Sequence, residues 1–166
     1  MDTRLAIASR RDERRYGPEP LADALVARIL DAGRLAGSSR NRQPWIFVVP
    51  QSRERVDALA ATVSVPANVL GAGLVVAVVV GGKGPLSFDA GRAAQNMLLA
   101  AWNDGVGSCP NGVRDADGAE RIVGAPVGIV LSFGYPARPR DPESRTPEEW
   151  SARANRKPCD EVVRTG

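Results

Sequence analysis

Apolar and polar positions along this chain predict helices and strands that follow one another without an internal repeat or a low-complexity segment. Apolar residues recur at helical spacing in five segments, residues 3–9, 22–36, 52–61, 89–104 and 116–123. Short apolar runs predict strands over residues 45–49, 73–80 and 127–133. The run 73–80 is almost wholly small and β-branched, as expected for a central strand covered on both faces.

The segment 89–104 predicts the most regular helix. Its apolar residues form one continuous stripe, which consists of Ala90, Ala93, Ala94, Met97, Leu98 and Ala101. Because alanines permit close approach of a neighbouring backbone, we expect this helix at the centre of the fold. Residues 105–112, GVGSCPNG, end the helix and are interpreted as a glycine-rich connection. Trp45, Trp102 and Cys109 are interpreted as core residues.

Residues 135–166 have a different composition from the rest of the chain. From Tyr135 onward the chain is rich in proline, arginine and glutamate, and no apolar face is sufficient for a core. The segment ends close to Val162 and Val163, so we expect the tail to pair with the body of the protein or with a second copy of the chain.

Composition favours a single globular domain over residues 1–166, with 43% hydrophobic and 25% charged residues. The longest apolar run, residues 74–80, is too short to span a bilayer, and residues 1–20 lack the hydrophobic core of a signal peptide. Cys109 and Cys159 form no CxxC pattern. A reducing cytoplasm and no membrane partner are therefore expected.

The chain contains no histidine. This excludes Ser-His-Asp and Cys-His nucleophilic machinery, HExxH zinc sites and histidine acid–base chemistry. Any activity must then run on a cofactor, on carboxylates, or on arginine, tyrosine and cysteine side chains. We expect no metal site, and a bound cofactor becomes the economical source of the chemistry.

Arginine dominates the positive charge, since only Lys83 and Lys157 among the 22 basic residues are lysines. Arginine is the side chain best shaped to hold phosphate through two hydrogen bonds. Three groups are candidates for an anion site, Arg10-Arg11 with Arg14-Arg15, Arg40 with Arg42, and Arg156-Lys157. Solvated arginines or a compositional bias would explain them equally. An arginine-rich nucleic-acid binder is an alternative function, although the aromatic residues, 5% of the chain, are not interleaved with the basic clusters.

Residues 38–45, SSRNRQPW, gather hydroxyl and amide side chains at the mouth of an apolar strand. Pro44 fixes its own φ and restricts Gln43, so this turn offers hydrogen-bonding groups from a constrained backbone. Such a turn suits a planar ligand with polar edges, although an ordinary helix-to-strand loop has the same composition. Backbone N–H groups around Asn111 and Gly112 are a second candidate for a ligand edge, because glycine allows close approach.

Four blocks together resemble the FMN-dependent nitroreductase family. Residues 10–16, RRDERRY, resemble its opening "RRSxRxF", and residues 38–45 resemble its "PSxxNxQPW" segment. Residues 89–109 are similar to its central helix and the turn that follows, and residues 156–163, RKPCDEVV, are similar to its "RKPLEEVV" ending. The blocks occur in family order over nearly the whole chain.

The resemblance implies an α+β homodimer with a three-layer α-β-α arrangement, a mostly antiparallel central sheet, a long central helix and two FMN sites at the interface. It places Arg10, Arg11 and Arg14 near the phosphate, the ribityl chain and the N1–C2 side of the flavin, with Asp12 among them. Ser38, Ser39 and Asn41, beside Gln43, would come from the other subunit. Asn111 and Gly112 would offer N–H groups to N5 and O4, and Arg156 and Lys157 would close on the phosphate.

The implied activity is transfer of hydride from NAD(P)H through FMN to nitroaromatic or quinone-like acceptors. Three departures bear on it. Asp12 stands where the family has serine and would repel a phosphate unless an arginine pairs with it. Gly37 replaces a common proline, and Asn68 offers only an amide where many relatives carry a basic residue. A deazaflavin-dependent reductase or a flavin-binding protein of the same fold remains an alternative.

Overall fold

The computed structural model describes residues 1–166, which form two compact units. A central unit contains residues 11–139, and a terminal unit combines residues 1–10 with residues 140–166. None of the helices is both long enough and apolar enough to cross a membrane.

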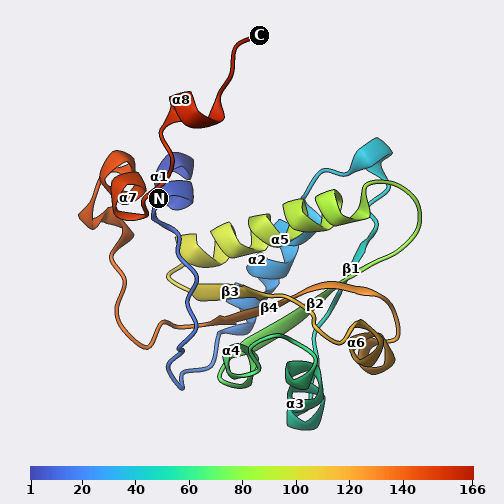
Figure 1. Cartoon of the computed structure of the whole chain (residues 1–166). Helices are drawn as coiled ribbons and strands as arrows, with labels where there is room; N and C mark the ends of the chain where they lie inside the picture. Colours follow the sequence, from blue (N-terminus) through green and yellow to red (C-terminus); the bar gives the residue numbers. More distant parts are fainter. The chain divides into compact units, whose positions relative to one another are not determined.

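The central unit is built on one four-stranded sheet (Figure 1). Its strands are β1 (Trp45–Val48), β2 (Leu74–Val80), β3 (Gly107–Asn111) and β4 (Val127–Gly134). They lie in the order β1-β2-β4-β3, and every neighbouring pair is antiparallel. Strand β2 is buried along nearly its whole length, which confirms the central strand predicted from its β-branched run.

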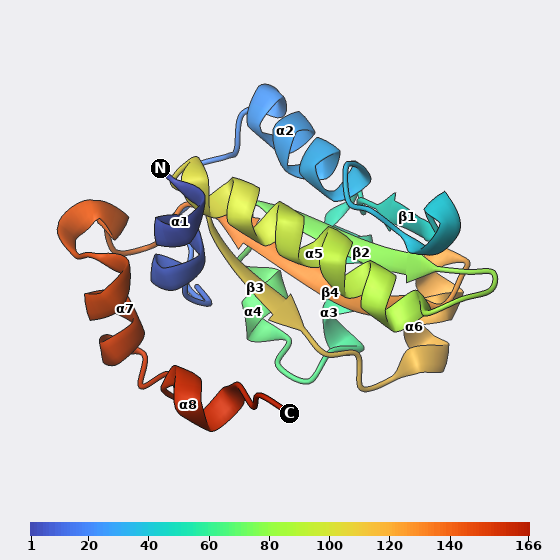
Figure 2. The same cartoon turned by 90° about the horizontal axis from the view of Figure 1, so that it is seen from above.

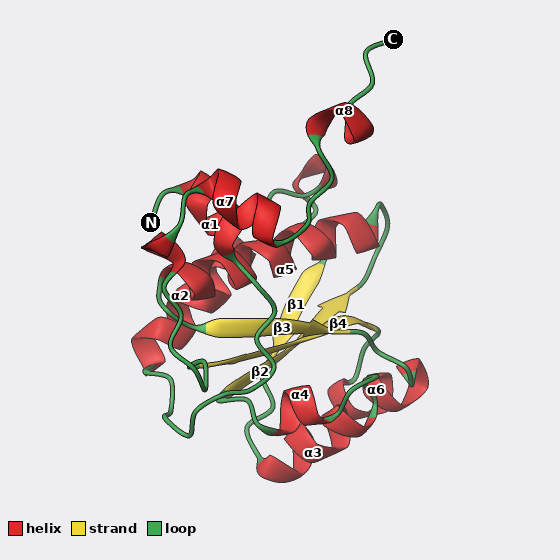
Figure 3. Cartoon of the chain, turned by 60° about the vertical axis from the view of Figure 1, so that its left-hand side comes forward, coloured by secondary structure: helices red, strands yellow, loops and turns green.

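Helices cover both faces of this sheet. On one face lie α2 (Asp23–Arg34) and α5 (Leu86–Asn103), and on the other lie α3 (Arg53–Ala61), α4 (Ala67–Leu70) and α6 (Ala116–Val123) (Figure 3). A short 3₁₀ turn, η1 (Ser39–Asn41), leads from α2 into β1. The layers confirm the α+β class, and the predicted helices are present with ends that differ by a few residues.

The core between α5 and the sheet uses the predicted alanine stripe. Ala93, Met97 and Ala101 are fully buried, and they face α2 as well as the strands. Gly33 of α2 makes this contact close, because a Cβ there would lie 2.3 Å from Met97 Cε. A second core on the other face surrounds Leu59 and Val63.

Strand β3 corrects the sequence interpretation of residues 105–112 as a connection. Residues 107–111 pair with β4 from Gly107↔Gly134 to Asn111↔Val130. Pro110 argues against a strand in the sequence, because proline cannot donate a hydrogen bond to a strand ladder. It is tolerated here because β3 is the last strand in the order of the sheet.

The terminal unit contains α1 (Thr3–Ser9), η2 (Pro142–Ser144), α7 (Pro147–Arg153) and α8 (Cys159–Val162). Helix α7 packs against α1 (Figure 2), and Arg4 forms an ion pair with Glu148. Helix α1 was predicted from the sequence, whereas η2, α7 and α8 were not, because apolar positions after Tyr135 are few. Helix α7 forms with a capping box instead, in which Glu149 N–H donates to Thr146 Oγ1 and Thr146 N–H donates to the Glu149 carboxylate.

Two glycines that face each other across β3 and β4, Gly107 and Gly134, make room for the segment 11–16. A Cβ on Gly134 would lie 2.8 Å from both Cβ and Cγ of Tyr16, and a Cβ on Gly107 would lie 2.7 Å from Glu13 Cβ. The paired glycines therefore let this segment pack directly on the sheet.

We expect Gly134→Ala to lower the free energy of unfolding by about 1–3 kcal/mol, because the new methyl group overlaps the ring of Tyr16. Gly71→Ala is the matched control, since the nearest atom to its Cβ is the Ala67 carbonyl oxygen at 4.0 Å. Urea unfolding of both variants measures the difference. Equal stability of the two variants would show that residues 11–16 do not pack on Gly134.

Candidate functional site

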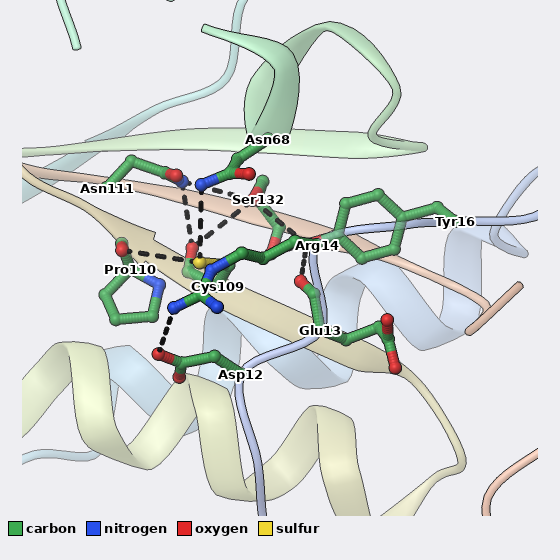
Figure 4. A network of polar contacts seen from close by, with 9 residues as sticks. All are labelled: Asp12, Glu13, Arg14, Tyr16, Asn68, Cys109, Pro110, Asn111 and Ser132. Carbon is green, nitrogen blue, oxygen red and sulfur yellow. Dashed lines mark hydrogen bonds and ion pairs between the residues drawn. The ribbon is translucent and has the colours of Figure 1, made fainter. Parts of the chain in front are cut away.

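The segment 11–16 passes the start of β3, where Asp12 forms an isolated parallel bridge with Ser108. Glu13 N–H donates to the Ser108 carbonyl at 2.9 Å. This backbone pairing places Arg14 beside β3, with 62% of its side chain exposed. Arg14 Nη2 lies 3.6 Å from Asp12 Oδ2 (Figure 4). Beside a phosphate, Asp12 would need an arginine as its partner. Arg14 is in a position to be that partner.

Tyr16 holds this segment in place through the hydrogen bonds of its hydroxyl group. Its hydroxyl donates to the Glu13 carbonyl at 2.7 Å and lies 3.0 Å from Ser132 Oγ and 3.2 Å from the Ser132 carbonyl (Figure 4). Burial raises the pKa of Tyr16 far above its ordinary value, while the hydrogen bond with Ser132 opposes the rise. The phenol is thus held neutral and acts as a structural donor.

Asn111 at the end of β3 joins the same network. The residue is only 4% exposed, and its Nδ2 donates to the carbonyls of Cys109 at 3.0 Å and Val130 at 3.2 Å and to Ser132 Oγ at 3.1 Å. The opposite amide orientation would set Oδ1 against two carbonyl oxygens, so the network determines how the amide points. Its Oδ1 has no hydrogen-bond partner in the chain.

The backbone after Asn111 presents two donors. No hydrogen bond within the chain uses the N–H of Gly112 or of Val113, although the Gly112 carbonyl accepts from Ser64 N–H at 3.0 Å. Gly112 is exposed and Val113 is half-buried. The sequence pointed to the N–H groups of Asn111 and Gly112; the structure adds that of Val113, for which the sequence offered no signal beyond the neighbouring glycine.

Asn68 lies in α4 and is 8% exposed. Its Nδ2 points to Cys109 Sγ at 3.9 Å, so its amide lies next to β3 as a buried group. Cys109 is 2% exposed, which confirms its interpretation as a small core residue. The structure thus brings Asp12, Arg14, Asn68, Asn111 and Gly112 together around β3, with Arg11 at the start of the same segment.

The second predicted group is the turn at residues 38–43. Arg40, Asn41 and Gln43 have positive φ values of 54°, 53° and 49°. Such conformations cost about 1–3 kcal/mol each and concentrate at functional sites. Ser38 Oγ accepts from Gln43 N–H at 2.8 Å, and the buried carboxylate of Asp89 accepts from Ser39 N–H at 3.1 Å. These bonds hold the turn against its own strain.

Within one chain the turn at residues 38–43 and the start of β3 lie near opposite ends of α5. Asp89, which binds the turn at residues 38–43, is in the first turns of this helix, whereas β3 begins with Gly107 just after the helix ends. At about 1.5 Å per residue, the stretch from Asp89 to Asn103 separates these ends by roughly 20 Å. A single copy therefore does not bring Ser38, Ser39, Asn41 and Gln43 to Arg14.

The remaining predicted residues belong to the terminal unit. Arg156 and Lys157 line a hollow of about 560 Å³ together with Arg4, Ile7 and Cys159. Arg10 follows the last turn of α1 and is half-buried. The terminal unit thus carries an exposed basic pair beside apolar side chains. No group of three or more Cys, Asp or Glu side chains is arranged to hold a metal ion.

Comparison with known proteins shows that the chain belongs to the nitroreductase family, whose profile matches residues 7–78 and 86–135. A protein of Methanothermobacter thermautotrophicus, provisionally named NADH dehydrogenase/NAD(P)H nitroreductase, is 30% identical over 150 residues, which cover 82% of this chain and 78% of that protein. The 4-nitrobenzoate reductase of Pseudomonas putida is 39% identical over 62 residues, 37% of this chain and 27% of that enzyme.

A structural relative supports the same assignment. A provisionally assigned nitroreductase from Desulfovibrio desulfuricans, solved in complex with FMN, is 28% identical and superposes with a TM-score of 0.79. The match covers 100% of this chain and 98% of that chain. The family resemblance and the fold class inferred from the sequence are confirmed.

The raised pKa of Tyr16 predicts a loss of stability in alkali. The unfolded chain releases this proton near pH 10, whereas the folded chain retains it, so the free energy of unfolding falls as the pH rises above 10. Tyr16→Phe lacks this dependence. We expect the variant to be less stable at pH 8 by about 1 kcal/mol, because one buried hydrogen bond is lost.

Urea unfolding of both proteins between pH 8 and pH 11 tests this expectation. The stability gap should narrow above pH 10, by at most about 1.4 kcal/mol per pH unit. A gap that stays constant across this range would mean that Tyr16 titrates alike in the folded and unfolded chains.

Proposed function

We propose that this protein is a homodimeric FMN-dependent oxidoreductase that passes electrons from NADH or NADPH to nitroaromatic or quinone-like acceptors. The observation that carries the proposal is the edge of β3, where the exposed guanidinium of Arg14 lies beside the strand and the unused N–H groups of Gly112 and Val113 follow its last residue. Family membership, the FMN-bound relative and the names of the relatives support it.

The residues present fit a flavin mononucleotide. A guanidinium favours the negative charge that develops on the N1–C2 side of the ring, and two adjacent backbone donors suit the N5 and O4 edge. Bound FMN would supply hydride chemistry at N5, so no acidic or basic side chain is obligatory. Arg10, Arg11, Arg156 and Lys157 are assigned to the phosphate as part of the proposal.

The proposal requires two copies of the chain, because Ser38, Ser39 and Asn41 lie near the other end of α5 from Arg14. One face of α5 offers a surface for assembly. A hollow of about 330 Å³ lies over it, lined by small residues that include Gly91, Ala94 and Gly128. A second copy would cover these groups and bring its own turn to the first copy's Arg14.

The absorbance spectrum of the purified protein, followed by its mass in solution, tests this proposal. We expect a yellow dimer with the FMN spectrum that NADH or NADPH bleaches in the absence of air. Uptake of a deazaflavin in place of FMN would assign the alternative reductase of the same fold, and flavin that neither donor reduces would assign a binding protein. Colourless protein that takes up no flavin, or retention on DNA that FMN does not displace, would contradict the proposal.

Arg14→Ala should weaken FMN binding about tenfold, because a charge-assisted contact to the flavin is lost. It should also lower the reduction potential, because the positive charge near N1–C2 is absent. Flavin fluorescence titration and potentiometry measure the two effects. Arg121→Ala is the matched control. It removes an exposed arginine from α6, which lies on the face of the sheet opposite α5. Unchanged affinity and potential in Arg14→Ala would show that Arg14 does not face the ring.

A mixing experiment separates a shared site from two independent ones. When Arg14→Ala is coexpressed with Ser39→Glu, half of the dimers combine both variants, and each of these has one intact and one doubly altered site. At an FMN concentration too low to load either single variant, activity should therefore recover to about a quarter of wild type, as two-fold symmetry requires. No recovery in a verified mixed dimer would mean that both groups act within one chain.

A further inference from the structure

Phe88 and Arg92 form an exposed pair on the first turns of α5. The guanidinium carbon of Arg92 lies 5.8 Å from the centroid of the Phe88 ring, and the ring is 66% exposed. Stacking of this kind restrains a long cationic side chain without neutralising it. No carboxylate forms an ion pair with Arg92 within the chain.

The pair is attached to the turn at residues 38–43. A Cβ on Gly37 would lie 2.6 Å from Arg92 Nη2 and 3.3 Å from its guanidinium carbon, so the end of the arginine side chain lies directly against the backbone of Gly37. Gly37 precedes Ser38 directly, and Asp89, three residues before Arg92, accepts the hydrogen bond from Ser39 N–H. Arg92 therefore brings a positive charge next to the turn.

Other basic residues reinforce this charge. Arg40 and Arg42 are exposed in the turn. Arg42 Nη1 donates to the Lys83 carbonyl at 3.4 Å, so the loop before α5 lies next to the turn. None of these cations forms an ion pair within the chain, and Asp89 is buried and already accepts from Ser39. This end of α5 thus combines an exposed aromatic face with uncompensated positive charge.

We propose that Arg92, stacked on Phe88, selects electron acceptors in which an aromatic ring carries an anionic group, such as a carboxylate or sulfonate. The guanidinium would hold the anion through two parallel hydrogen bonds, and Phe88 would contact the ring. This inference rests on the proposed function, because it places the Ser38–Ser39 turn beside the flavin. It adds a specificity residue that the sequence motifs do not contain.

The 2′-phosphate of NADPH is a second anion that the same charge would attract. The two anions, that of the acceptor and that of NADPH, are distinguished by which substrate preference Arg92 controls. A site for the acceptor alters the preference between charged and neutral acceptors, whereas a site for the phosphate alters the preference between NADPH and NADH. Both preferences are therefore measured on the same variants.

The test compares kcat/KM for 4-nitrobenzoate and for the neutral 4-nitrobenzamide in the FMN-loaded protein. Arg92→Gln should lower the ratio of these two values about tenfold, chiefly through the KM for the anion, because charge-assisted hydrogen bonds are lost. Arg92→Lys keeps the charge but not the planar guanidinium group. Its ratio should therefore lie between those of the wild type and Arg92→Gln. Arg121→Gln makes the same change of charge on α6 and should leave the ratio unchanged.

Three outcomes would overturn this inference. The ratio stays constant in Arg92→Gln; both acceptors lose activity equally as flavin is released; or only the preference for NADPH over NADH falls. A wild-type protein that binds FMN but reduces neither acceptor would contradict the proposed function itself. That result is distinct from reduction of both acceptors with an unchanged ratio.

Discussion

The pairing of Asp12 and Glu13 with the edge of β3 is the constraint on which the candidate site depends. An edge strand offers unpaired backbone groups, and here the chain's own N-terminal segment uses them through the Asp12↔Ser108 bridge and the bond from Glu13 N–H. The facing glycines Gly107 and Gly134 allow this contact. Arg14 is positioned by backbone pairing, so its side chain remains exposed and available to a ligand.

A buried polar network makes the pairing specific. Tyr16 and Asn111 meet on Ser132 Oγ, which joins the N-terminal segment, the end of β3 and β4. Buried donors that lose their partners cost about 1–3 kcal/mol each, so a slip in the register of β3 would be expensive. The network therefore fixes the position of the Arg14 backbone and the positions of the N–H groups of Gly112 and Val113.

The sequence predicted the elements whose causes are local. Ser52 caps α3 through a bond from Arg55 N–H, and the alanine stripe of α5 is buried as its spacing required. Strand β3 could not be predicted in this way, because GSCPN has little intrinsic strand propensity and pairs only because β4 offers a free edge. The inward amide of Asn111 follows from the same register. Gly37 was visible as a departure, but its contact with Arg92 depends on how α5 lies beside the turn.

The acidic departure at Asp12 is compatible with an anionic ligand once energies are compared. Its pair with Arg14 is long, 3.6 Å, and the arginine side chain is 62% exposed. Exposed pairs of this kind contribute about 0–1 kcal/mol, whereas a charge-assisted hydrogen bond contributes about 1.5–3 kcal/mol. A phosphate or carbonyl oxygen would therefore displace Asp12 from Arg14 at little cost. Because backbone pairing holds Asp12 in place, its carboxylate keeps the guanidinium of Arg14 near the strand.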